Sequence, residues 1–342
     1  MKVDKSNPNK PIIVAIIANL IIAISKGVGY LFSGSTALLS ETIHSIADVC
    51  NQSLLFIGVK RGQMGETELL NYGHSQERFF WNLLSAVGIF ILGCGVTVYH
   101  GIHQFLSKEK FVGKDESIQI IILLILLVSL IAETYSFKVA INEIKLEAKN
   151  RNKGFREYLN NSIDPSISAI FWEDFAAILG IAFAFIGILL TNITGDTTFD
   201  SVASILIGLL MGYIALHLAI ENKKFLVDRS IPQYEMNQIL GTLKENKIIT
   251  SYEDIKSIVL GPERLKIRLK LNLDINNLFK QDIDFLIEDL KSMGVKEIQS
   301  EKAREVIKNY NKNLFIKREL TLKEIEKSLT DKVSTLKHID II

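Results

Sequence analysis

The sequence predicts a membrane protein in two parts: an all-α bundle of six transmembrane helices over residues 1–222 and a soluble α+β domain over residues 223–342. Long apolar stretches recur before residue 222, and 16 of the 39 Lys and Arg residues lie there, against 23 in the shorter remainder. Alternating apolar and polar residues, typical of strands, appear in the second part at 263–273. Lipid requires a span to satisfy its own backbone hydrogen bonds, so we expect helices in the first part.

Five of the six spans follow from length and hydropathy, since a span needs about 20 mostly apolar residues. The basic lead and first apolar run resemble a secretory signal, but no Ala-x-Ala exit follows, so we interpret this run as the first span. The fifth begins at Asp164 and Pro165, a capping acid followed by proline at the first helical position. The five predicted spans are about 11–33, 81–106, 118–140, 166–192 and 199–220.

The remaining span, at 36–59, is predicted from its context. It carries Glu41, His44 and Asp48, which a soluble amphipathic helix would also show. However, a short SGST link joins it to the first span, and Lys60 and Arg61 close it. This arrangement favours an antiparallel hairpin whose polar face turns into the bundle.

Positive charges predict how the bundle is oriented, because Lys and Arg stay preferentially in the cytosol. They gather before the first span, between the second and third, and between the fourth and fifth. In the 107–117 connection three lysines are diluted by three acids. We therefore expect both termini to be cytoplasmic, and we expect a multi-pass protein of a bacterial inner membrane.

The second part is predicted to be an α+β domain of about 110 residues, within the usual domain range. Helix-like patterns at 233–246 and 280–293 flank strand-like ones at 253–260 and 263–273, and HIDII is a possible last strand. It contains no Gly-rich phosphate loop, nucleophile elbow or HExxH, so we do not expect an enzyme. The net charge is only +1 and no basic stripe is present, which excludes a nucleic-acid binder.

Ionisable residues at membrane depth are costly and therefore indicate function or structural pairing. His44 and Asp48 are four residues apart on one helix face and make half of a tetrahedral cation site; a buried His–Asp hydrogen bond is the alternative. Glu173 and Asp174 are adjacent, so they point about 100° apart and only one faces the second helix fully. At ~1.5 Å per residue, Asp174 lies roughly 13 Å from Pro165 and Asp48 roughly 18 Å from Lys60, so the two pairs meet near the midplane.

The predicted metal site therefore consists of His44, Asp48, Asp174 and Glu173. Imidazole and carboxylate ligands suit Zn²⁺, but also Mn²⁺, Fe²⁺ or Co²⁺, so ligand type does not select the metal. Three further charges lie in or near the hydrocarbon, and we expect structural pairing or an interfacial position for each, although any of them could line a pathway: Lys26, Glu133 and Asp200.

Several long motifs resemble the cation diffusion facilitator family of metal transporters. The run GSTALLSETIHSIADVCNQSLLFIG resembles the family's second-helix signature. The segments YGHSQERFFWNLLSAVGIFILGCGVTVYHG, VAINEIK, IDPS, WEDFAAILG and FDSVASILIGLLMG are similar to the branch that includes zinc transporter nine. The resemblance covers essentially the whole chain.

The resemblance implies a homodimer of six-helix protomers with ferredoxin-like C-terminal domains in the cytosol, which exports Zn²⁺ in exchange for H⁺ by alternating access. His44 and Asp48 match the family's two ligands on the second helix. The fifth helix departs from the pattern, because Ala169 and Ile170 stand where a ligand four residues before the acid is usual. Two rivals stay open: a membrane-anchored interaction protein that binds metal structurally, and a passive cation channel.

Overall fold

The computed structural model describes residues 10–107, 116–150, 153–262, 264–292 and 301–342. The chain divides into two compact units, Met1–Val227 and Asp228–Ile342, here called the helical unit and the C-terminal unit. The division lies five residues beyond the boundary that the sequence predicts at 222, because the last helix of the first unit continues through its basic end to Leu226.

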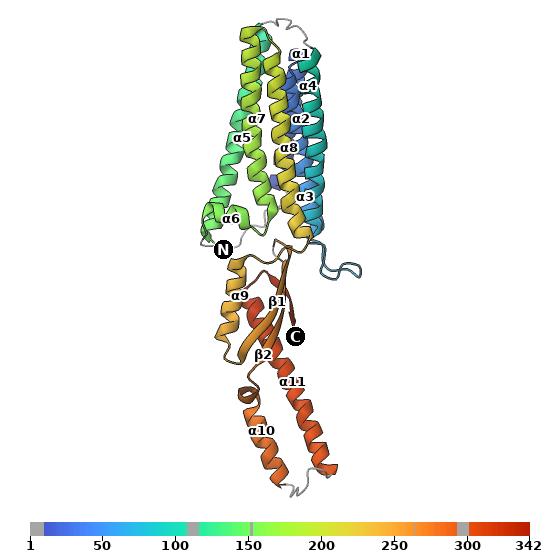
Figure 1. The fold of residues 1–342 in the computed structure, drawn as a ribbon, viewed down its shortest axis with the longest axis vertical. Helices are drawn as coiled ribbons and strands as arrows, with labels where there is room; N and C mark the ends of the chain where they lie inside the picture. Colours follow the sequence, from blue (N-terminus) through green and yellow to red (C-terminus); the bar gives the residue numbers. More distant parts are fainter. Residues whose placement is uncertain (1–9, 108–115, 151–152, 263, 293–300) are drawn as a thin grey trace. The chain divides into compact units, whose positions relative to one another are not determined.

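The helical unit is built of long helices that run side by side (Figure 1). The third predicted span is continuous over Glu77–Ser107 and contains a π-helical segment, η1. The elements are α1 (Lys10–Ser33), α2 (Thr36–Gly62), α3 (Glu77–Gly88), η1 (Ile89–Val96), α4 (Thr97–Ser107), α5 (Glu116–Asn150), α6 (Phe155–Asn161), α7 (Pro165–Thr194) and α8 (Thr198–Leu226).

Four of these helices are long and apolar enough to cross a membrane: Glu77–Ser107, Ser117–Asn150, Pro165–Thr194 and Thr198–Leu226. In α1 the apolar part among the described residues is shorter, Asn19–Ser33. Helix α2 is long, but its acids and histidine lower its hydropathy. The fold is therefore mostly helical with four candidate spans, and a count of six spans stays a prediction.

The helical unit has small and polar residues inside and large apolar residues outside. Ala176, Ala184 and Ala203 belong to its buried core, and Ser201 and Ser204 are fully buried. Large apolar side chains are exposed on α1, on the Glu77–Ser107 span, and on α5, α7 and α8. Such extensive exposure is rare in soluble monomers and is typical of a surface that lipid covers.

Two helices of the bundle begin at well-defined caps. The Asp164 side chain accepts from the backbone N–H of Ser166, 3.0 Å away, and Pro165 occupies the first turn of α7, as the sequence predicts. At the start of α2, the Ser35 hydroxyl accepts from the N–H of Leu38, and the Asp200 carboxylate accepts from the N–H of Thr36 at 2.6 Å. A carboxylate here also offsets the positive end of the helix dipole.

Helices α7 and α8 approach closely at Gly187. A Cβ added there would lie 2.5 Å from the Cβ of Ala203 and 3.1 Å from the carbonyl oxygen of Phe199. We predict that Gly187→Val forces the two helices apart and lowers the stability of the purified protein by about 1–3 kcal/mol. A lower unfolding temperature in detergent would show it.

The matched control is Gly88→Ala, because nothing lies within 4 Å of a Cβ added at Gly88. Alanine is the better helix former by about 1 kcal/mol, so this variant should lose no stability. Equal unfolding temperatures for Gly187→Val and the unsubstituted protein would contradict the close approach.

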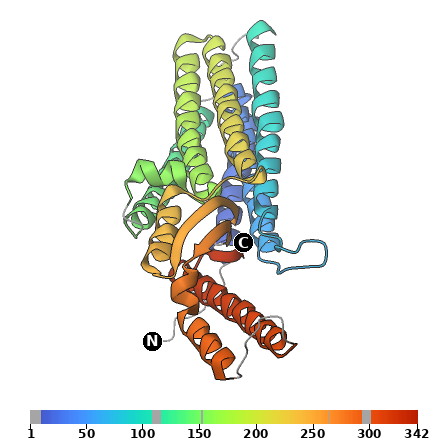
Figure 2. The same cartoon turned by 60° about the horizontal axis from the view of Figure 1, so that its bottom comes forward.

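The C-terminal unit is a three-stranded sheet with helices. Strand β1 (Ile249–Gly261) pairs antiparallel with β2 (Arg264–Leu273), and β2 pairs parallel with β3 (Leu336–Ile341), in the order β1-β2-β3. Helices α10 (Ile275–Ser292) and α11 (Glu301–Lys332) lie side by side in both views (Figures 1 and 2) and belong to the crossover from β2 to β3. Helix α9 (Gln233–Glu245) packs against α11.

The alternation that predicts a strand at 263–273 is present in β2, where every second residue from Leu265 to Leu271 is buried. Strand β1 begins four residues earlier than predicted and ends one later. The described residues thus form a small α+β unit, while a ferredoxin-like fold for it stays a prediction.

Candidate functional site

Helix α2 directs a row of polar side chains into the helical unit. The Nε2 atom of His44 lies 3.4 Å from Oδ2 of Asp48, within ion-pair distance. The two groups are not oriented as a hydrogen bond, and both ring nitrogens of His44 are buried without a hydrogen-bond partner among the described residues. The two side chains therefore form an ion pair and no hydrogen bond, and the choice between a metal site and a structural pair stays open. In its neutral form, such an imidazole would have one lone pair available for a ligand.

The two acids on α7 diverge, as adjacent residues on a helix must. Glu173 turns toward α2, where its Oε2 accepts from Nδ2 of Asn51 at 2.5 Å. Asp174 turns toward α5, where its Oδ2 accepts from the hydroxyl of Ser136 at 3.0 Å. The two carboxylates are thus held by different neighbours.

The four predicted ligands share one region of the bundle but do not converge on one point. Helix α2 packs against α7, and Asp174 lies within electrostatic range of both His44 and Asp48. Glu173 lies within range of Asp48. Across the described parts of the chain, however, no three His, Cys, Asp or Glu side chains are grouped so that they could hold one ion. Ligation of a metal by three of these groups would require side-chain or helix movement.

Sequence reasoning missed the residues that orient the acids. Asn51 holds Glu173 and in turn accepts from the hydroxyl of Ser85 on α3, at 2.5 Å. Ser136 holds Asp174 from α5. In the sequence, each of them is visible only as a polar residue within an apolar span. Ser and Asn residues that merely hydrogen-bond one helix to another look the same in sequence.

Glu133 on α5, for which we expected a structural pair, an interfacial position or a place along a pathway, lies near the candidate site. It is 8% exposed and within electrostatic range of Asp48, His44 and Asp174. In the sequence, an isolated acid within an apolar span already indicated a functional or paired position for Glu133. The structure therefore adds a fifth ionisable group from a third helix to this region.

Lys26 and Asp200 have structural partners, as expected. The Nζ of Lys26 lies 2.9 Å from Oε2 of Glu41, and both side chains are fully buried. Asp200 accepts from the hydroxyl of Ser35 at 2.6 Å and from the N–H of Thr36, so it fixes the start of α2 against α8.

Polar contacts between helices occur on both sides of His44. Toward the start of the helix, the hydroxyls of Ser40 and Ser204 lie 2.6 Å apart. Toward its end, Nδ2 of Asn82 on α3 donates to the hydroxyl of Ser166 on α7 at 3.1 Å, and the Arg78 guanidinium pairs with Asp164 at 2.8 Å. The candidate ligands thus lie in the middle of a polar line through the bundle.

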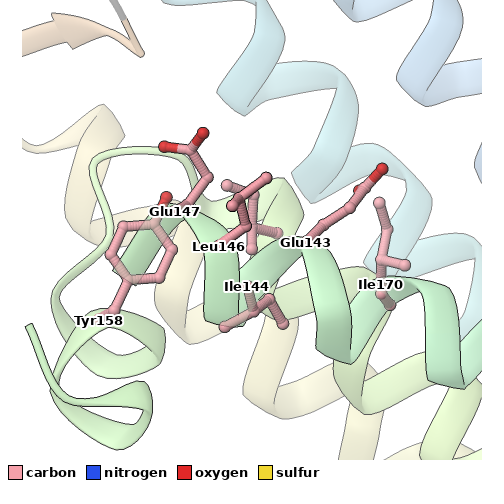
Figure 3. A pocket seen from close by; sticks show the side chains of 8 residues that line it. Glu143, Ile144, Leu146, Glu147, Tyr158 and Ile170 are labelled. Carbon is pink, nitrogen blue, oxygen red and sulfur yellow. The ribbon is translucent and has the colours of Figure 1, made fainter. Parts of the chain in front are cut away.

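A cavity of about 320 Å³ lies at the ends of α5 and α7, beside α6 (Figure 3). None of the four predicted ligands lines it, although Ile170, one turn before Asp174, does. Glu143 and Glu147 make its lining partly acidic. The full lining consists of Ala140, Glu143, Ile144, Leu146, Glu147, Tyr158, Ile167 and Ile170.

The other histidines of the helical unit have partners of their own. His74 pairs with Glu77 at 2.5 Å between Nδ1 and Oε1. His100 and His103 lie beside the ring of Tyr99, and His217 packs edge-on against Trp172. None of them joins His44 and Asp48.

Comparison with known proteins identifies the family. A family model described as the cation efflux transmembrane domain matches residues 12–227. The chain is similar to the human protein named "Proton-coupled zinc antiporter SLC30A9, mitochondrial", with 29% identity over 339 residues. It is 30% identical to the mouse protein of that name over 339 residues. Each match covers 98% of this chain and 58% of the relative.

"Metal tolerance protein C4" of Arabidopsis thaliana is 26% identical over 345 residues, which is 100% of this chain and 74% of that protein. The chain therefore spans a little under three fifths of the length of the mammalian relatives and about three quarters of the plant one.

The expectation of a bacterial inner membrane is wrong. The human and mouse relatives, and one from Pongo abelii, match 98% of this chain and are mitochondrial by name. Positive charges indicate which segments share one side of a bilayer, but no residue specifies which membrane it is. The cytoplasmic placement of the termini rests on the same assumption and does not stand.

Apolar helices of membrane-spanning length, a His–Asp pair on α2 and a family match over residues 12–227 all point to a membrane transporter of metal cations. This multi-pass membrane protein belongs to the cation efflux family of metal transporters, the cation diffusion facilitators, and stands close to the branch of zinc transporter nine.

Proposed function

We propose that this protein is a zinc transporter that exchanges Zn²⁺ for H⁺ by alternating access, and that it works as a homodimer of six-helix protomers. It moves the metal away from the compartment that contains the C-terminal unit. The relatives named as a proton-coupled zinc antiporter and as a metal tolerance protein support a cation efflux function and favour zinc.

The observation that carries this proposal is the imidazole of His44, which has no hydrogen-bond partner among the described residues and lies beside Asp48. Burying a polar group without a hydrogen bond costs free energy, so a sequence that keeps one has a use for it. An imidazole nitrogen and a carboxylate 3.4 Å apart make half of a first coordination shell, and the acids of α7 would supply the other half after side-chain or helix movement. The proposed ligands are His44, Asp48 and Asp174, with Glu173 as the fourth candidate.

Proton exchange follows from the chemistry of such ligands. Imidazole and carboxylate must lose protons before they bind metal, so binding zinc releases H⁺ and protonation releases zinc. A site that opens alternately to the two sides therefore couples the two flows in opposite directions. His44 suits that requirement, since neither of its ring nitrogens is hydrogen-bonded to another described residue, and the Asp48 carboxylate lies 3.4 Å away.

We predict that a pH gradient drives zinc transport by the purified full-length chain in liposomes. With a zinc-sensitive dye trapped inside, uptake should accelerate several-fold when the lumen is more acidic than the bath, and slow when the gradient is collapsed by a proton ionophore. The matched control is the same preparation carrying Asp48→Asn, which leaves lipid leak and protein density unchanged.

Other outcomes identify the rivals. Zinc binding without flux that responds to the gradient indicates a membrane-anchored metal-binding protein. Zinc currents that do not depend on the proton gradient indicate a passive channel. Faster uptake of Mn²⁺, Fe²⁺ or Co²⁺ than of Zn²⁺ would support the same exchange mechanism with a different metal. Imidazole and carboxylate ligands do not by themselves select among these metals.

A further inference from the structure

A fully buried ion pair adjoins the candidate site, and the proposed function leaves it unused. Lys26 on α1 and Glu41 on α2 are both 0% exposed, and Nζ lies 2.9 Å from Oε2. The same ammonium donates to the hydroxyl of Ser45, also at 2.9 Å. Lys26 thus bridges two residues that lie one turn apart on α2.

This pair lies next to the proposed ligands along the helix. Glu41 lies three residues before His44 and Ser45 directly after it, and residues three or four apart share one helix face. Asp48 lies within electrostatic range of both Lys26 and Glu41, and Glu133 within range of Lys26. A cation held by His44 and Asp48 would therefore experience the Lys26 charge.

Glu41 is only half satisfied. Its Oε2 binds Lys26, while its buried Oε1 has no hydrogen-bond partner among the described residues. That oxygen lies against α7, where a Cβ added at Gly180 would be 2.4 Å away. The absence of a side chain at Gly180 leaves the space for this carboxylate. Glu41 is thus a buried carboxylate with one free oxygen, a turn from His44.

A buried salt bridge that served only to join α1 and α2 would contribute little or no net stability. Removing two charges from water costs more than their attraction returns unless the geometry is excellent, and apolar packing often serves as well. A fixed positive charge near a cation site has a different consequence: it opposes a divalent ion, and it occupies the carboxylate that would otherwise join the ion's ligands.

We propose that Lys26 sets the metal affinity of this transporter: it is a tethered cation that keeps Glu41 out of the coordination shell and weakens zinc binding enough for release. This inference rests on the proposed function, since it takes His44 and Asp48 as ligands. Lys26 is a positioning residue, which acts through Glu41 and through its charge without contacting the metal.

The test measures the zinc dissociation constant of the purified full chain by competition with a fluorescent chelator. Lys26→Met keeps the length of the side chain and removes its charge, so it should bind zinc about tenfold tighter or more. In liposomes the same variant should show a lower KM together with a lower maximal rate, because release is slowed. Lys26→Arg keeps the charge and should stay close to the unsubstituted affinity.

A second comparison, between Glu41→Gln and the double variant, keeps the test decisive if Lys26→Met alone misfolds. Glu41→Gln should bind zinc more weakly, because the Lys26 charge is left without its counter-ion. Adding Lys26→Met to Glu41→Gln gives a neutral pair and should tighten binding relative to Glu41→Gln alone. A purely structural ion pair predicts that both single variants lose affinity and unfolding temperature together.

Unchanged or weaker zinc binding when the Lys26 charge is removed, in either background, would overturn the inference. That failure is distinct from failure of the proposed function, which would appear as absence of zinc binding or of flux in the unsubstituted protein.

Discussion

Replacing His44 by Gln or Asp48 by Asn should weaken zinc binding by roughly 100-fold or more and abolish flux driven by a pH gradient. Loss of groups that merely orient metal ligands costs about 10–100-fold in affinity, and loss of a ligand itself is expected to reach or exceed the top of that range. Both substitutions preserve approximate size and remove a donor, so packing around these side chains should change little. Isothermal titration with zinc and flux into liposomes measure the two effects.

The matched controls are His103→Gln and Asp196→Asn, which remove the same chemical groups from exposed positions outside the candidate site. Both should bind and transport zinc as the unsubstituted protein does. If His44→Gln and Asp48→Asn retain zinc affinity within a few-fold while folding normally, the α2 half of the site is wrong.

On α7, Asp174→Asn should cost more zinc affinity than Glu173→Gln, by about tenfold or more. Asp174 lies within electrostatic range of both His44 and Asp48, whereas one oxygen of Glu173 is already held by Asn51 at 2.5 Å. A serine hydroxyl, the neighbour of Asp174, is easily re-oriented when a cation arrives, and its bond to a carboxylate can persist beside a metal. Parallel zinc titrations of the two variants measure the difference.

The Asn51→Ala variant separates the two roles further. If Glu173 only orients helices through Asn51, removing the amide should lower the unfolding temperature and leave zinc affinity within a few-fold. A larger loss of affinity in Glu173→Gln than in Asp174→Asn would reverse the assignment and make Glu173 the ligand from α7.

Hydropathy predicted the apolar parts of the helices well and their ends poorly. The fourth span was expected over 118–140, but α5 continues to Asn150, because a sequence such as EIKLEAKN is too polar for lipid yet rich in good helix formers. Caps were more informative: Asp164 and Pro165 mark the start of α7 in sequence and structure alike. Hydropathy and charge could not predict which membrane contains the helices, nor which compartment the two termini face.

The candidate site could be predicted within one helix and not between helices. Helical spacing alone brings His44 and Asp48 together, and the structure has them 3.4 Å apart. Spacing likewise predicts that Glu173 and Asp174 diverge. It carries no information about pairs formed by packing, so the ion pair of Lys26 with Glu41 could not be derived from the sequence.

Simultaneous measurement of zinc and proton flux in the same liposomes tests the central claim most directly. With equal pH on both sides and a zinc gradient imposed, zinc entry should drive protons outward, seen as alkalinisation by a trapped pH dye, and both signals should vanish in Asp48→Asn. Zinc entry with no accompanying pH change would contradict proton-coupled exchange at this site.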